Sequence, residues 1–215
     1  MLTLDGKHVF VAGGSRGIGR ATAILAARAG ANVTVNYVAN ADAARETVRE
    51  IEGLGRRGFA VQADLSADGA AETAVADAVS ALGELSGLVV SAGIFEGATI
   101  AEMTGAFWDR TMNINLRGTF LAVKAGAASL RKNGGSVVII ASTAGQRGSA
   151  DYSAYATSKG AQLLFMRSMA KELAPDRVRV NAVAPGWTET DMSRDAMTAF
   201  GREGIIASIP MGRIG

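Results

Sequence analysis

The sequence predicts an α/β protein built as a three-layer, doubly wound parallel sheet with helices on both faces. Short apolar runs alternate with longer helical patterns along most of the 215 residues, which implies right-handed strand–helix–strand crossovers. Residues 136–141 (SVVIIA) form an apolar strand candidate, as expected where both faces of a sheet are covered. A glycine-rich segment also follows the first apolar run directly.

The individual elements follow from the same patterns. Strands are expected at residues 7–12, 32–36, 58–62, 87–91, 136–141 and 178–183. Helices are expected at residues 17–29, 42–54, about 68–82, 107–131 and 153–173. No linker rich in Pro, Ser or Gly divides the chain, so residues 1–215 are expected to form one domain.

Composition limits the classes of function. The chain has no Cys and one His, His8, so we expect neither disulfides nor a metal site. Its 22 basic and 20 acidic residues give a net charge of +2 without long runs of one sign, so we expect no nucleic acid partner. No apolar stretch is long enough to span a membrane, and residues 1–7 lack a signal-peptide pattern, so a cytoplasmic location is expected.

The glycine-rich loop predicts a nucleotide site. Gly13, Gly17 and Gly19 let the backbone turn sharply and approach a pyrophosphate, while the next helix directs its first amides at the phosphates. Similar glycine patterns occur in structural turns, but the position between a strand and a helix favours nucleotide binding. Further candidate contacts in this loop are Ser15, Arg16 and Ile18.

The end of the second strand indicates which nucleotide binds. Proteins that bind NAD place an acidic residue there against the ribose hydroxyls, whereas this sequence has Asn36 and Tyr37. Arg16 is a candidate for the 2′-phosphate of NADP, and a solvated arginine is the alternative. The sequence therefore favours NADP(H), with NAD(H) as the second choice.

Tyr155 and Lys159 are the candidates for acid–base chemistry. They lie four residues apart in the helix expected at 153–173, so they share one face, whereas Tyr152 has only Ala156 at that offset. A neighbouring ammonium should lower the pKa of the Tyr155 phenol. Ser142 follows the fifth strand, at the sheet edge where ligands bind, and could hydrogen-bond the carbonyl oxygen that Tyr155 protonates. A helix N-cap is its alternative role.

Together these motifs resemble the short-chain dehydrogenase/reductase family over essentially all 215 residues. The glycine spacing matches the family's T-G-x-x-x-G-x-G, with Ala12 in place of Thr, and residues 115–118 (NLRG) match its N-x-x-G. The resemblance implies a Rossmann-like fold and an NAD(P)-dependent oxidoreductase that acts on CH–OH groups.

The resemblance also implies a catalytic set of Asn115, Ser142, Tyr155 and Lys159. Ser142 would orient the carbonyl, Tyr155 would deliver the proton, and Lys159 would hold the ribose and tune Tyr155. Asn115 would anchor a water that connects Lys159 to solvent, and a helix kink is the alternative reason for an Asn there. Asn113 is given no role.

Several further cofactor contacts follow from the resemblance. Asp64 matches an acid that contacts adenine, with a turn cap as the alternative. Pro185 and Gly186 would turn the chain toward the nicotinamide, and Thr190 would meet its carboxamide. Trp187 would either wall the substrate pocket or cover the core. The remaining expected contacts are Leu65, Ser91, Ala92, Gly93 and Thr188.

Two features depart from the family. Residues 90–93 (VSAG) replace its N-N-A-G, so Ser91 should brace the central sheet less well than Asn. The family continues beyond the point of Gly215 into a helix and a seventh strand, which also form a subunit interface. We therefore expect either a longer chain or an open sheet edge. The helices at 107–131 and 153–173 remain candidates for contacts in a homo-oligomer, a dimer or a tetramer.

The loop at residues 13–19 (GGSRGIG) and the pair Asn36-Tyr37 most resemble the 3-oxoacyl-[acyl-carrier-protein] reductase branch. That branch implies a 3-oxoacyl thioester or related ketone, fatty acid biosynthesis, and an acidic acyl-carrier protein as partner. Candidates for a basic landing surface, interrupted by Asp176, are Arg131, Lys132, Arg167, Lys171 and Arg177. Sugar, steroid or xenobiotic reduction is the alternative, and a non-catalytic nucleotide-binding regulator is a third. The substrate pocket is expected from residues 144–152 and 187–209, the latter as a mobile lid.

Overall fold

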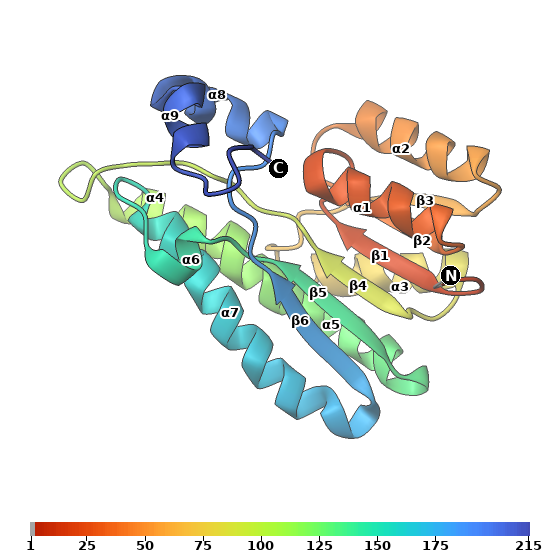
Figure 1. The fold of residues 1–215 in the computed structure, drawn as a ribbon. Coiled ribbons are helices and arrows are strands. Elements are labelled where there is room, and N and C mark those ends of the chain that lie inside the picture. Colours follow the sequence, from red (N-terminus) through yellow and green to blue (C-terminus); the bar gives the residue numbers. More distant parts are fainter. Residues whose placement is uncertain (1–2) are drawn as a thin grey trace.

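Six strands form one parallel sheet in the computed structural model, which describes residues 3–215 (Figure 1). They are β1 (His8–Ala12), β2 (Asn32–Tyr37), β3 (Gly58–Gln62), β4 (Gly87–Val90), β5 (Gly135–Ile140) and β6 (Val178–Val183). The order across the sheet is β3-β2-β1-β4-β5-β6, and all neighbouring pairs are parallel. The predicted doubly wound α/β fold is confirmed. The order reverses between β1 and β4, and the carboxyl ends of strands at such a switch point are where open α/β sheets bind ligands.

Helices cover both faces of this sheet. They are α1 (Gly17–Arg28), α2 (Ala41–Gly53), α3 (Ala70–Leu82), α4 (Gly105–Met112), α5 (Gly118–Asn133), α6 (Ala144–Arg147), α7 (Ser153–Leu173), α8 (Asp191–Phe200) and α9 (Arg202–Ala207). The helices α1 and α2 pack on the strands β1, β2 and β3 from one side. The helices α3, α5 and α7 pack on the other side, across the whole width of the sheet.

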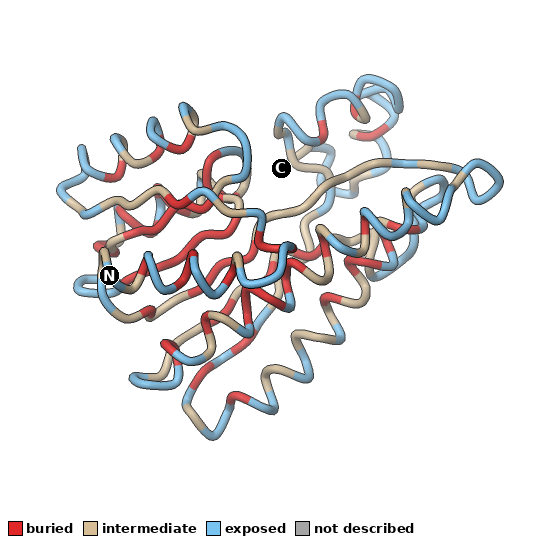
Figure 2. Tube along the Cα trace, turned by 180° about the vertical axis from the view of Figure 1, so that it is seen from behind, coloured by how far each residue is buried: buried red, intermediate tan, exposed pale blue. Residues whose placement is uncertain are grey.

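The core lies in two apolar layers, one on each face of the sheet, as the buried stretches along the strands show in Figure 2. Alternate residues of one strand enter different layers: Phe10 packs toward α3 and α5, whereas Val9 and Val11 pack toward α1. All five residues of β1 are buried. The apolar strand patterns in the sequence arise from this two-sided burial.

The structure corrects the expectation of one continuous helix over residues 107–131. A five-residue π-helix, Asn113–Arg117, separates α4 from α5. Residues 187–209, expected as a mobile lid, contain the helices α8 and α9, and α6 was not predicted. The other predicted boundaries agree within about two residues, the usual scatter of helix and strand ends.

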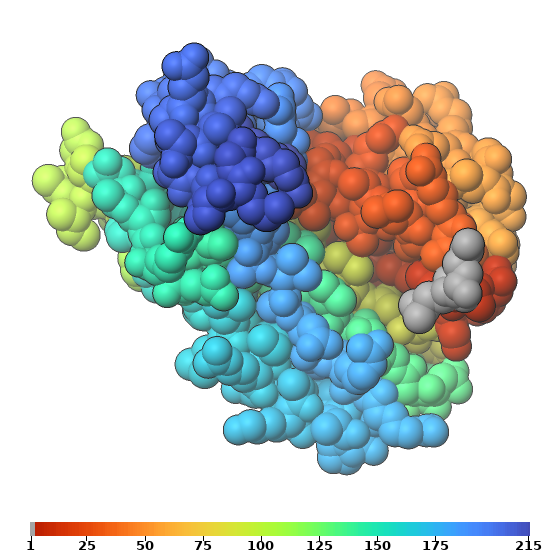
Figure 3. Space-filling model, in the orientation of Figure 1, coloured from red at the N-terminus to blue at the C-terminus, as the bar shows by residue number. Residues whose placement is uncertain are grey.

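The elements that follow the carboxyl ends of the strands gather at one end of the molecule. Figure 1 shows the segment after β4, the short helix α6 and the helices α8 and α9 there. In the space-filling view the C-terminal part of the chain, dark blue, touches the N-terminal part, red to orange (Figure 3). The strand β6 is at one edge of the sheet and pairs only with β5 within residues 3–215.

No helix in residues 3–215 is long and apolar enough to cross a membrane.

Candidate active site

The glycine loop is shaped by close backbone contacts that exclude side chains. Gly13 has a φ of +73°, and a Cβ there would lie 2.8 Å from both the amide nitrogen and the Cα of Ala92. A Cβ on Gly19 would overlap the carbonyl oxygen of Gly13. Both glycines are therefore required by the packing of the loop. The predicted neighbours Ser91 and Ala92 lie directly beside it, since the Ser91 amide donates to the Ala12 carbonyl at 3.0 Å.

Asn36 supports this loop through hydrogen bonds. Its side chain is buried; it accepts a hydrogen bond from the Gly13 amide at 3.3 Å and donates to the Ala63 carbonyl at 3.0 Å. The Asn36 carbonyl accepts from the Gly14 amide at 2.9 Å. Asn36 therefore acts on the loop itself, and its amide does not point into solvent. Tyr37, at the end of β2, is half-buried.

Arg16 and the first amides of α1 face outward beside this loop. Arg16 is the N-cap residue of α1, with extended backbone, and its side chain is exposed and has no ion-pair partner among residues 3–215. No side chain caps the helix, so its first amides remain available for an anion. A Cβ on Gly17 would lie 3.4 Å from Cγ2 of Thr190, so the start of α8 faces the same loop. Ser15 is buried in the loop and Ile18 is half-buried.

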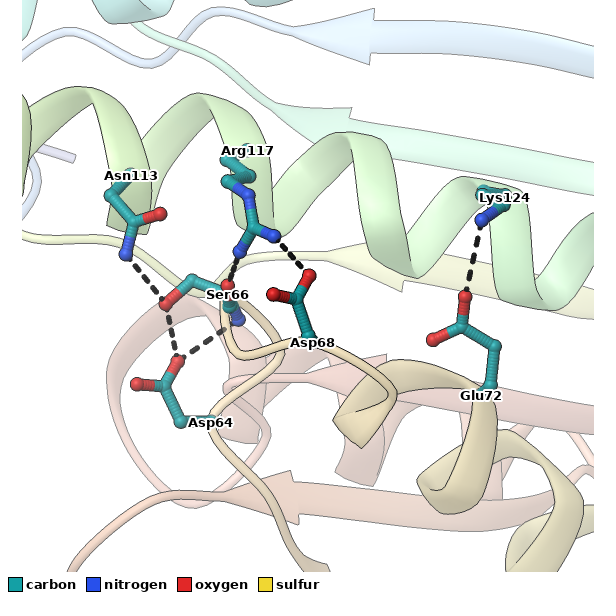
Figure 4. A network of polar contacts seen from close by, with 7 residues as sticks. All are labelled: Asp64, Ser66, Asp68, Glu72, Asn113, Arg117 and Lys124. Carbon is teal, nitrogen blue, oxygen red and sulfur yellow. Dashed lines mark hydrogen bonds and ion pairs between the residues drawn. The ribbon is translucent and has the colours of Figure 1, made fainter.

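The loop after β3 is tied to the π-helix by a polar network (Figure 4). Asp64 accepts hydrogen bonds from the amide and the hydroxyl of Ser66, at 2.9 and 2.7 Å, so it does cap a turn. Asn113, for which no role was predicted, donates to the Ser66 hydroxyl at 3.2 Å, and Arg117 donates to the Ser66 carbonyl. Leu65 is buried between these contacts. The network fixes the loop that carries the candidate adenine contact.

Asn115 is the buried centre of the π-helix. Its side chain accepts from the Ile94 amide at 2.8 Å and donates to the Ile94 carbonyl at 3.0 Å and to the Ser158 hydroxyl at 3.1 Å. Its backbone carbonyl accepts from Thr119 and from Gln162, each at 2.7 Å. Asn115 thus holds the segment after β4 against α7, and the helix irregularity considered from the sequence is present.

Ser142, Tyr155 and Lys159 converge at the carboxyl end of β5. The Lys159 ammonium donates to the Ile140 carbonyl at 2.7 Å and lies 5.8 Å from the centre of the Tyr155 ring. The Ser142 hydroxyl lies close enough to the Tyr155 phenol to favour its ionised form. It also accepts a hydrogen bond from the Ala144 amide at 3.1 Å, a local turn bond just before α6, whose N-cap residue is Thr143.

Burial governs the proton affinities of this group. It lowers the pKa of Lys159 from 10.5 to about 8. It raises the pKa of Tyr155, whereas the neighbouring Ser142 hydroxyl acts to lower the pKa of Tyr155. We expected Lys159 to lower the pKa of Tyr155. In the structure of the chain alone the pKa of Tyr155 is raised instead, because the cost of removing the phenolate from water outweighs the favourable contacts.

The shifted pKa of Lys159 predicts a pH dependence of stability. Between pH 8 and 10.5 the unfolded chain binds more protons at this residue than the folded chain does, so its contribution to the free energy of unfolding rises with pH. Replacing Lys159 by Met should remove that rise. Urea unfolding of both proteins at pH 8 and 10 measures it. An equal rise in the variant would mean that another group is responsible.

The nicotinamide-end candidates lie where the last part of the chain meets Ser142. The Pro185 carbonyl accepts from the Thr143 amide at 3.0 Å, and the Thr188 hydroxyl donates to the Gly186 carbonyl at 3.4 Å. Thr190 caps α8, together with Ser193. At Gly93 a Cβ would lie 3.0 Å from the Asn115 side-chain oxygen and 3.7 Å from the Lys159 nitrogen. The sequence candidates from Gly13 to Tyr155 therefore lie next to one another along the carboxyl ends of the strands, where open α/β sheets bind ligands. We call this region the crevice.

A group of aromatic side chains borders this crevice, and sequence reasoning found only part of it. Phe95 contacts the Tyr152, Tyr155 and Trp187 rings, and Phe200 contacts those of Tyr152 and Trp187. We name these five residues the aromatic cluster. Trp187 belongs to this cluster and is not among the residues of either core layer, which argues against its covering the core. Phe95 and Phe200 carried no sequence signal because their neighbours come from distant segments.

The candidate basic landing surface lies elsewhere. Arg131, Lys132, Lys171 and Arg177 precede β5 or β6, so they are at the amino ends of the strands, opposite to the crevice. Lys171 is sixteen residues from Tyr155 in the same helix, about 24 Å along its axis. Arg131 pairs with Asp176 at 2.8 Å, and Lys132 pairs with Glu84 at 2.6 Å. These four candidates therefore do not border the crevice.

Comparison with protein families gives one match over most of the chain. The sequence model for the short chain dehydrogenase family matches residues 7–199.

Individual relatives and solved structures agree with that match. A 3-oxoacyl-[acyl-carrier-protein] reductase of Staphylococcus aureus is 35% identical over 210 residues, covering 97% of this chain and 85% of the relative. An L-rhamnose 1-dehydrogenase (NAD(P)(+)) of a Sphingomonas species is 36% identical, and the match covers 100% of this chain and 86% of the relative. The crystal structure of a dehydrogenase/reductase from Sinorhizobium meliloti 1021 has a TM-score of 0.92 and 38% identity, covering 100% of this chain and 84% of that one.

Proposed function

The chain belongs to the short-chain dehydrogenase family, and on that premise we propose that it interconverts a ketone and a secondary alcohol with NADP(H) as its cofactor. The convergence of Ser142, Tyr155 and Lys159 beside the glycine loop carries this proposal. The family acts on CH–OH groups as an oxidoreductase. We further propose that residues 1–215 work as one cofactor-binding and catalytic unit.

The crevice suits a dinucleotide. The backbone around Gly13 and Gly19 leaves no room for a side chain, and the uncapped start of α1 offers amides for a pyrophosphate. Gly93 and Thr190 continue the same surface toward the catalytic residues. When bound, the nicotinamide supplies or accepts the hydride.

In the proposed reaction the Ser142 hydroxyl holds the carbonyl oxygen and the Tyr155 phenol gives it a proton. The raised pKa of Tyr155 keeps the phenol protonated for reduction. Lys159 is fixed by the Ile140 carbonyl and places a positive charge beside Tyr155, which stabilises the phenolate left after proton transfer. Asn115 positions the segment after β4 against these groups, and we retain for it the supporting role in the proton relay.

The preference for NADP(H) rests on Arg16. Its exposed guanidinium has no acidic partner among the described residues, and the end of β2 carries Asn36 and Tyr37 in place of an acid. A 2′-phosphate bound between Arg16 and the end of β2 would contact a cation and would meet no repelling carboxylate. The alternative cofactor is NAD(H).

Replacing Arg16 by Ala should weaken NADPH binding about ten- to a hundredfold and leave NADH binding nearly unchanged, because one charge-assisted phosphate contact is lost. Arg28→Ala, at the exposed far end of α1, is the matched control. Nucleotide fluorescence titrations give the dissociation constants. An equal loss for both nucleotides would show that Arg16 does not bind the 2′-phosphate.

The reaction itself is tested by following NADPH consumption with a set of carbonyl compounds, with NADH in parallel. The relatives are named for a 3-oxoacyl-[acyl-carrier-protein] and for L-rhamnose, so an uncharged 3-oxoacyl thioester and a sugar lactone belong in the set. We expect turnover of at least one ketone, and faster with NADPH. Nucleotide binding without any turnover would favour a non-catalytic regulator.

We also propose a cytoplasmic homo-oligomer. Phe120 on α5 is 45% exposed and Leu164 on α7 is 64% exposed, which is unusual for apolar side chains on two adjacent helices. Packing of α5 and α7 against those of a second copy would cover both. Light scattering should give a dimer or tetramer mass, and Leu164→Glu should lower it.

A further inference from the structure

We propose that the aromatic cluster selects ketones that carry a flat apolar ring, a substrate class that deepens the proposed function and rests on it. Five of the chain's 7 Phe, 3 Tyr and 2 Trp residues gather in this cluster, and one of them is the catalytic Tyr155. A carbonyl held by Tyr155 and Ser142 would therefore lie beside aromatic rings.

Phe95 is the centre of the cluster. Its ring is stacked on Tyr152, with centroids 4.5 Å apart and planes at 15°, and meets Tyr155 edge-on at 4.8 Å and 66°. It meets Trp187 nearly at right angles, at 6.1 Å. These are the geometries in which aromatic rings attract one another, and a substrate ring would be recognised in the same way.

The position of Phe95 is fixed by backbone contacts on both sides. Asn115 binds both the amide and the carbonyl of Ile94, the residue before it. Beyond it, Ala98 donates to the Asp151 carbonyl at 2.7 Å, and a Cβ on Gly97 would lie 2.9 Å from the Tyr152 ring. The cluster is thus a prearranged wall, which lowers the entropic cost of binding a rigid ring.

The opposite side of the cluster is open. Phe200, on α8, is 53% exposed and lies 5.7 Å from Trp187 and 6.0 Å from Tyr152. A hollow beside it is lined by Tyr152, Phe200 and the segment from Gly97 to Thr99. An apolar ring entering here would meet aromatic surface that is still in contact with water.

Charge disfavours an acyl-carrier substrate at this entrance. The same hollow is lined by two carboxylates, Glu102 and Asp151, and by no Lys or Arg. An acidic carrier protein would meet these two carboxylates there, and four of the basic candidates, Arg131, Lys132, Lys171 and Arg177, lie at the other end of the sheet. A neutral ring-bearing ketone meets neither obstacle.

The test compares 4-phenylbutan-2-one with 4-cyclohexylbutan-2-one, which share the ketone chain and differ in the ring, aromatic and flat in one and saturated and puckered in the other. The third compound is S-acetoacetyl-N-acetylcysteamine, an uncharged thioester. For the wild type we expect kcat/KM with the phenyl ketone to exceed the other two about tenfold. Phe95→Leu should reduce that preference about two- to tenfold, the usual range for losing one aromatic contact. Phe200→Leu, at a half-exposed position that tolerates replacement, should reduce it less.

The control is Phe59→Leu, in β3 at one edge of the sheet and outside the aromatic cluster, which should leave all three rates unchanged. A preference for the thioester, or an equal loss for both ketones in Phe95→Leu, would overturn the inference and leave the reductase proposal standing. No turnover of any of the three compounds, or of any other ketone, with NADPH bound would instead overturn the reductase proposal.

Discussion

Replacing Tyr155 by Phe is expected to lower kcat by about 10²–10⁴-fold and to leave NADPH binding nearly unchanged. The phenyl ring keeps its edge-on contact with Phe95, so the shape of the crevice is retained. What is lost is the hydroxyl that lies beside Ser142 and that we propose gives a proton to the substrate oxygen. Loss of a positioned general acid typically costs this factor.

The measurement is the steady-state rate of NADPH consumption, paired with a nucleotide titration of the same protein. Thr157→Ala is the matched control, since Thr157 is exposed on the same turns of α7. It should keep the wild-type rate. A Phe variant that retains more than about a tenth of the rate would remove Tyr155 from its catalytic role, because no proton could then come from that position.

Gly19→Ala should abolish nucleotide binding at working concentrations and destabilise the fold by about 1–3 kcal/mol. A Cβ at this position overlaps the Gly13 carbonyl, so the loop and the start of α1 must move apart. That movement displaces the amides proposed to bind the pyrophosphate. Binding is measured by nucleotide titration and stability by urea unfolding.

Gly53→Ala provides the control for the chemical change itself. Gly53 ends α2, has nothing within 4 Å of its added Cβ and lies away from the crevice. Alanine there should stabilise the protein by up to about 1 kcal/mol, since helices favour Ala over Gly. If Gly19→Ala bound NADPH like the wild type, the glycine loop would not be the nucleotide site.

The sequence by itself determined the sheet, the glycine loop and the spacing of Tyr155 and Lys159. These are local properties: alternation places Val9 and Val11 on one face and Phe10 on the other, and four residues make about one helical turn. The family could be recognised from the same patterns, whereas the order of the strands was not predicted and is seen only in the structure. Asp64 and Ser142 could be proposed as site residues because each lies just after the end of a strand.

Other features were decided by contacts between distant segments. In the π-helix at Asn113–Arg117, the side chain of Asn115 is hydrogen-bonded to Ile94 and to Ser158. Both partners are distant from Asn115 in sequence. Asn36 is buried beneath Gly13, and Phe95 meets rings from α7 and α8. A pattern along the chain holds no information on which remote side chain fills a given space.

Tertiary structure also decided the electrostatics. Sequence spacing brings Lys159 near Tyr155 and suggests a lowered pKa for the phenol, whereas burial by the surrounding segments raises it. The basic residues at the ends of α5 and α7 resemble a landing surface in sequence but lie opposite to the crevice, partly paired with Asp176 and Glu84. Desolvation and the direction in which a charge faces depend on the whole fold, so only the assembled structure sets them.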